Sequence, residues 1–152
     1  MATEVQGIEG VKEIVGKEIG PSEWRTITQA DIDTFAEVSG DHQWIHVDVE
    51  RAKAESPFGG PVAHGYLTLS LAAPFLFEVF EVEGITAAIN YGLDKVRFTA
   101  PVPVGSNLRA AGTLLSARSR AGVVECKIKL KYELESGGKS PCTAELVILL
   151  QP

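Results

Sequence analysis

The stretch VECKIKLKYEL, residues 124–134, alternates between apolar and charged residues along its whole length. The apolar positions are Val124, Cys126, Ile128, Leu130, Tyr132 and Leu134, and every position between them is Glu or Lys. Successive side chains of a strand point to opposite faces, so this period of two predicts a β-strand with one buried and one wet face. We expect a sheet that covers a core on one side.

The neighbouring segments indicate further strands. The turn SGGK, residues 136–139, leads into SPCTAELVILL, residues 140–150, and predicts an antiparallel hairpin. Two earlier strand-like runs, AINYGLDKVRF at 88–98 and NLRAAGTLLSAR at 107–118, are joined by the loop TAPVPVGS. If Ser136 pairs with Lys139, Cys126 lies opposite Leu149, too far from Cys142 for a disulfide.

A helix is expected before these strands, over HGYLTLSLAAPFLFEVF at 64–80, which carries no charge until Glu78. In a soluble protein, a helix that is apolar on every side must be buried, because none of its faces is suited to water. It is short for a membrane span, and Pro74 interrupts it. A meander of long strands around one buried helix predicts an α+β fold of the hot-dog type, a curled antiparallel sheet wrapped around a long central helix.

Composition limits the class of protein. The chain has 152 residues, of which 45% are hydrophobic and 22% are charged. This length is enough for one complete core and too short to need two, so we expect one domain spanning 1–152. The net charge of −6 argues against a nucleic-acid partner. The N-terminal residues are interrupted by charges, unlike a signal or membrane anchor, and the two cysteines suit a reducing compartment, so we expect a cytoplasmic protein without a membrane partner.

All three histidines, His42, His46 and His64, fall in the segment 42–64. A helix capped by Thr28 is expected to end at Gly40, and another to begin after Asp48. Asp41 therefore projects from a helix end, and His46 follows five residues later. Such a pair can share one water molecule and act as general acid and base.

Two other interpretations of this stretch remain open. Asp41 can cap local backbone groups while His46 is a half-buried imidazole with its hydrogen bonds satisfied. Alternatively, Asp41, His42 and His46 can bind a metal, although no further ligand completes that set and we predict no metal site. His42 is expected at the rim of the site.

The segment PVAHGYLTL places Gly65 in the first turn of the buried helix. Its uncovered backbone N–H can hold a carbonyl oxygen on which negative charge develops, as in an oxyanion hole. The simpler interpretation is that Gly65 only permits a tight turn from loop to helix.

The segment FAEVSGDHQWIHVDVERA, residues 35–52, resembles the hydratase-2 signature of the MaoC-like, (R)-specific enoyl-CoA hydratase family. The matching positions are Phe35, Ser39, Gly40, Asp41, Ile45, His46 and Ala52. The segments GPVAHGYLTLSL and VRFTAPVPVGS are also similar to the family. Two departures concern specificity: Gln43-Trp44 stands where the family usually has Asn-Pro, and Ala73 stands about where some members have a serine near the thioester.

The resemblance implies a hydro-lyase that adds water reversibly to a trans-2-enoyl-CoA and gives the (R)-3-hydroxyacyl-CoA. Asp41 and His46 would be catalytic, and the Gly65 N–H would bind the thioester oxygen. The residues implied to line the substrate path are Val62, Ala63, His64, Ala88, Ile89, Asn90, Tyr91, Thr99, Ala100 and Pro101. No cofactor is implied beyond the coenzyme A of the substrate.

A homodimer is expected, because a curled sheet leaves an edge strand that a second copy can cover. Three alternative functions stay open from the sequence: a 3-hydroxyacyl-carrier-protein dehydratase of fatty-acid elongation, a hot-dog acyl-CoA thioesterase, and a non-catalytic acyl-thioester binding protein. The acyl chain length and the choice between coenzyme A and carrier protein are not determined by these residues.

Overall fold

A curled antiparallel sheet dominates the structure, a computed structural model that describes residues 1–152. Four long strands form its body: β5 (Ala87–Phe98), β6 (Asn107–Arg120), β7 (Val123–Leu134) and β8 (Cys142–Gln151). The order is β2-β6-β7-β8-β5, where β2 is Glu18–Ile19, and the short β3 (Arg25–Thr26) also pairs with β6. The predicted alternation in β7 is confirmed, since its apolar residues from Val124 to Tyr132 are buried.

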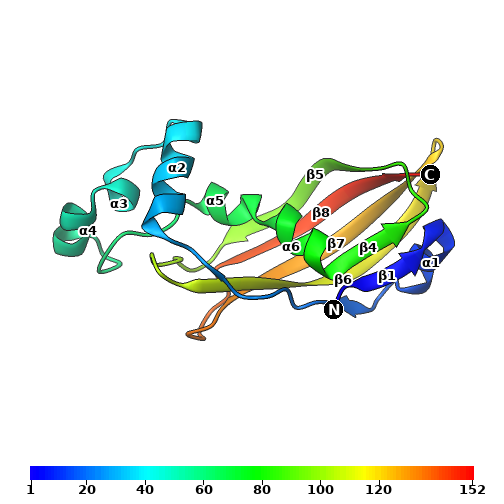
Figure 1. The fold of residues 1–152 in the computed structure, drawn as a ribbon, viewed down its shortest axis with the longest axis horizontal. Coiled ribbons are helices and arrows are strands. Elements are labelled where there is room, and N and C mark those ends of the chain that lie inside the picture. The colour runs from blue at the N-terminus through cyan, green and yellow to red at the C-terminus, as the bar shows by residue number, and fades with distance from the viewer.

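Two consecutive helices, α5 (Gly65–Ser70) and α6 (Ala72–Val79), lie against one face of this sheet (Figure 1). Leu67, Phe75 and Leu76 are buried, within one core cluster of 26 residues that includes both helices and the strands β6, β7 and β8. The hot-dog fold predicted from the sequence is therefore confirmed. The central helix is interrupted at Leu71, because Pro74 lies in the first turn of α6 and has no N–H to continue the hydrogen bonding of α5.

The central helix is not buried on every side, and that expectation was wrong for a single chain. Tyr66 is 72% exposed and Phe77 is 67% exposed. The neighbouring strand β5 lies at the edge of the sheet and exposes Ile89, Tyr91 and Leu93. An apolar helix face and an open strand edge therefore lie next to each other on the surface.

The β7–β8 hairpin has a different register from the one expected. Cys126 pairs with Ile148 rather than Leu149. The connection is longer than a tight two-residue turn, and Gly137 and Gly138 both adopt positive φ angles of 83° and 88°. Cys126 and Cys142 are buried and free.

Three short helices extend beyond one end of the sheet: α2 (Gln29–Ser39), α3 (Trp44–Val47) and α4 (Val49–Glu55) (Figure 1). The predicted ends of α2 and the predicted start of α4 are confirmed, whereas α3 was expected to be an irregular loop. The Thr28 side chain caps α2 in a capping box with Asp31, and Gly40 ends it with a φ of 80°. The Asp48 side chain accepts a hydrogen bond from the Arg51 N–H at the start of α4.

The opposite end of the sheet is covered by the N-terminal segment. There β1 (Thr3–Gln6) pairs in parallel with β4 (Phe80–Glu83), the strand that follows α6, and α1 (Gly7–Glu13) packs beside them (Figure 1). Val5, Val11 and Ile14 join the core.

No helix is both long enough and apolar enough to span a membrane.

Candidate active site

Asp41 is held in a short loop directly after α2. The Ser39 hydroxyl accepts a hydrogen bond from the Asp41 N–H at 3.2 Å, and the Asp41 carboxylate accepts one from the Gln43 N–H at 3.2 Å. Gly40 supplies the left-handed residue that turns the chain out of the helix. These local bonds fix the loop, while Asp41 itself is exposed to solvent.

His46 lies in α3 and is 7% exposed. Its Nδ1 donates to the Val62 carbonyl oxygen at 2.6 Å, so Nδ1 carries the proton. Burial lowers the pKa of His46 below its usual 6.5, although the bond to Val62 opposes that shift. The neutral ring therefore keeps a lone pair on Nε2, which is the form that a general base requires.

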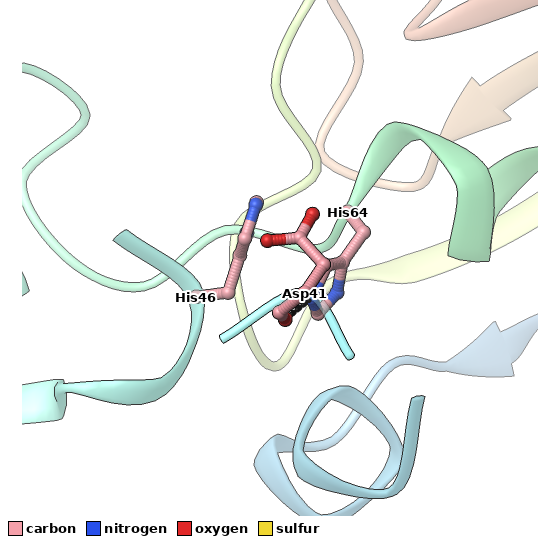
Figure 2. A group of neighbouring side chains, drawn as sticks. All are labelled: Asp41, His46 and His64. Carbon is pink, nitrogen blue, oxygen red and sulfur yellow. Dashed lines mark hydrogen bonds between the residues drawn. The ribbon is translucent and has the colours of Figure 1, made fainter. Parts of the chain in front are cut away.

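The structure brings Asp41, His46 and His64 together. Each contributes one atom that could bind a metal ion, a carboxylate oxygen or a ring nitrogen, and these three atoms lie within 4.8 Å of one another. Figure 2 shows the grouped side chains, with a hydrogen bond from the His64 ring to the backbone of Asp41. Two hydrogen bonds of about 2.8 Å span such a gap, so one water molecule fits between the Asp41 carboxylate and the His46 ring.

His42 is absent from this group, which bears on the metal interpretation. Its ring faces Glu37 and the Gly40 carbonyl oxygen, and it is exposed. His64 takes its place, but the rings of His46 and His64 are stacked, with centroids 3.9 Å apart and planes 23° apart. Stacked rings keep their in-plane lone pairs in two separate, nearly parallel planes, a poor arrangement for two ligands about 2.1 Å from one zinc ion.

Two loops that the sequence linked to the substrate border one groove of about 370 Å³. Val62, Ala63 and Gly65 line one part of it, and Thr99, Ala100 and Pro101 line another. His64, from the same segment, instead lies buried against His46, at 2% exposure. The groove therefore runs past Gly65 at the start of α5.

A second cavity of about 290 Å³ lies between the central helices and β5. Ala88 and Asn90 line it, whereas Ile89 and Tyr91 line neither this cavity nor the groove. Ala73 also borders it, together with Ser70. The hydroxyl of Ser70 and the amide of Asn90 are the polar groups available near Ala73.

A third cavity of about 370 Å³ continues deeper, toward Phe80 and Cys126. It shares four lining residues with the second, namely Leu76, Phe77, Ala88 and Ile148. Ten of its 11 lining residues are hydrophobic, as are ten of the 12 that line the second cavity, and we call these two adjoining cavities the apolar channel. Sequence reasoning missed Leu76, Phe77 and Ile148, because an apolar residue beside a cavity has the same sequence pattern as one in a packed core.

Comparisons with known proteins identify the family of this chain. The family model described as "MaoC like domain" matches residues 11–134. The 3-hydroxyacyl-thioester dehydratase Z of Mycobacterium tuberculosis is 46% identical over 134 residues, which cover 88% of each chain. Nodulation protein N of Rhizobium meliloti is 42% identical over 146 residues, covering 95% of this chain and 91% of that protein.

Among solved structures, R-hydratase PhaJ1 from Pseudomonas aeruginosa is similar, with a TM-score of 0.73 at 26% identity. The match covers 90% of this chain and 81% of that one. The family model spans most of the present sequence, including Asp41, His46 and both loops of the groove. This chain belongs to the MaoC-like dehydratase family.

Proposed function

We propose that this chain is a hydro-lyase that adds water reversibly to a trans-2-enoyl-CoA and forms the (R)-3-hydroxyacyl-CoA. The observation that carries the proposal is the placement of Asp41 and a neutral His46 within reach of one water molecule. The relative named 3-hydroxyacyl-thioester dehydratase Z supports the reaction class.

The chemistry requires two proton movements. His46 Nε2 accepts a proton from the water held by Asp41, while the water oxygen forms a bond to the β-carbon of the enoyl group. Addition at the β-carbon leaves an enolate, and its α-carbon takes the proton back from the His46 imidazolium on the same face, so no net proton is gained or lost. Proton transfer accounts for every step, so we propose no metal or redox cofactor, and coenzyme A enters with the substrate.

The groove and the channel suit the two parts of such a substrate. The thioester would lie at Gly65, where the uncovered N–H of the first turn of α5 can bind its oxygen as negative charge develops. The pantetheine would follow the loop of Thr99 to Pro101. The acyl chain would enter the apolar channel under α6, past Leu76.

We also propose that the working unit is a homodimer. The exposed apolar face joins Tyr66 and Phe77 of the central helices to Tyr91 and the open edge of β5. Large exposed apolar patches and long unpaired strands usually mark contact surfaces. Two free cysteines suit a reducing compartment, and we place the protein in the cytoplasm.

The test is to incubate the purified protein with crotonyl-CoA, with a longer trans-2-enoyl-CoA, and with the carrier-protein thioester of the longer acyl group. Hydration predicts loss of the enoyl-thioester absorbance without release of free thiol, and a product of (R) configuration. Release of thiol would instead identify a thioesterase. Binding without either change would identify an acyl-thioester binding protein, and activity only with the carrier-protein thioester would identify the elongation dehydratase.

A further inference from the structure

His64 is buried at the centre of the site but borders neither the groove nor the channel. It is the residue before α5 and is 2% exposed. Its Nε2 lies 2.9 Å from the Asp41 carbonyl oxygen, and one face of its ring stacks on His46. The Phe35 ring also packs against it, with centroids 4.9 Å apart.

The contact with Asp41 identifies the hydrogen-bonding role of the His64 Nε2. A carbonyl oxygen only accepts, so Nε2 must carry a proton and donate it to Asp41. Nδ1 is buried without any hydrogen-bond partner. His64 therefore gives its one hydrogen bond to the backbone of Asp41.

His64 contacts the two residues of the proposed mechanism in different ways, Asp41 through a hydrogen bond and His46 through a ring stack. The other bonds that fix Asp41 come from within its own loop, whereas the bond from His64 connects that loop to the start of α5, 23 residues further along the chain. The stack limits rotation of the His46 ring about the bond that Nδ1 makes to Val62. Displacing a reacting group by about 1 Å can cost about 10²-fold in rate.

We propose that His64 is a positioning residue, which holds the Asp41 loop with one hydrogen bond and the His46 ring with one stack, so that both face the same water. This inference deepens the proposed hydration function, and the kinetic part of its test rests on that function. It assigns to His64 a role distinct from the substrate contact that the sequence suggested.

Two variants separate the two contacts. His64→Gln keeps an N–H at the end of the side chain that can reach the Asp41 carbonyl oxygen, but it removes the ring. His64→Phe keeps a ring against His46 and removes the donor. Phe75→Leu is the matched control, because Phe75 of α6 is equally buried, packs on Tyr132 of β7 and takes no part in the hydrogen bond or the stack of His64.

We expect kcat to fall by about 10-fold to 10²-fold in His64→Phe, with KM changed less than about threefold, and to recover in part in His64→Gln. Phe75→Leu should lower the unfolding temperature by a similar amount without this loss of kcat. A rise in KM at constant kcat would overturn the proposal and identify a substrate-binding residue. A loss of kcat equal to that of Phe75→Leu at matched stability would show a structural role only.

A second readout needs no activity and keeps the inference separate from the hydration proposal. Amide hydrogen exchange at residues 40–43 should be faster in His64→Phe and close to wild type in His64→Gln. NMR titration of His46 should give a higher pKa in both variants, because a neighbouring imidazole that disfavours its protonation has been removed. Unchanged exchange and unchanged titration would overturn the role of His64, even in a protein that hydrates no enoyl-CoA.

Discussion

The strongest test of the proposed dimer is Tyr91→Glu, because Tyr91 lies on the open strand β5 and lines neither the groove nor the apolar channel. The Tyr91 side chain is 60% exposed. A fully buried aromatic side chain removes about 200 Å² from water, so the exposed part of Tyr91 amounts to roughly 120 Å². At about 25 cal/mol per Å², burying it against a partner stabilises the contact by up to about 3 kcal/mol.

A two-fold interface contains each residue twice, so the substitution removes the Tyr91 contact of both protomers. The loss reaches about 6 kcal/mol, or about 10⁴-fold in the dissociation constant. A dimer with a dissociation constant of about 1 nM would then be largely monomeric at micromolar concentration. Sedimentation velocity should show wild type at twice 16.3 kDa and Tyr91→Glu near 16.3 kDa.

Activity should fall with dissociation and return, per chain, as the concentration of the variant is raised. That recovery separates loss of the dimer from direct loss of a substrate contact, which would not depend on protein concentration. Leu115→Glu is the matched control, because Leu115 is an exposed apolar residue on β6, away from the β5 edge. A fully active species of 16.3 kDa, in wild type or in Tyr91→Glu, would refute the reasoning.

Three further predictions concern the site. Asp41→Asn and His46→Gln should each lower kcat by about 10²-fold or more with an unchanged circular dichroism spectrum, and near-normal turnover would remove that residue from the mechanism. Because burial lowers the pKa of His46 and the base acts unprotonated, the acid limb of kcat/KM should fall below pH 6.5; a limb above it contradicts the assignment. Leu76→Phe should reduce turnover of long enoyl-CoA substrates and spare crotonyl-CoA, since Leu76 lines both cavities of the channel, and equal losses would disprove that path.

Much of the fold was predictable because its signals are local. The period of two in β7 and the caps at Thr28, Gly40 and Asp48 each depend on neighbouring residues, and all are confirmed. The hairpin register was wrong by one residue, since the loop after Leu134 is longer than its two glycines suggested. Turn length decides register, and the sequence pattern alone did not fix that length.

Features that depend on distant contacts were not predictable in this way. The parallel pairing of β1 with β4 joins residues near opposite ends of the first half of the chain, and short strands carry little pattern. The exposed face of the central helix was mistaken for a buried one, because apolar composition does not tell whether the covering surface belongs to the same chain. Both features depend on which surfaces pack against each other, and a local sequence pattern does not carry that information.

The candidate site also combines features that local signals predict with features that depend on distant contacts. Asp41 and His46 were identified from a local signature, and the structure places them together. The contact of His64 with both of them could not be read from spacing, because it requires the start of α5 to pack against the loop after α2. The only signal in the sequence was the crowding of all three histidines into one segment.

The exposed apolar face also bears on catalysis. Phe98, at the end of β5, lies so close to Gly65 that a Cβ on Gly65 would be 3.2 Å from its ring, and Phe98 packs edge-on against Tyr66. The exposed face therefore reaches the residue that follows His64, while Asp41 remains open to solvent. A hydration site must admit one water and exclude others, since bulk water weakens every electrostatic contact within it. A second chain on this face would shield the groove beside Gly65 and satisfy the edge of β5, so the same contact can account for both the unpaired strand and the open site.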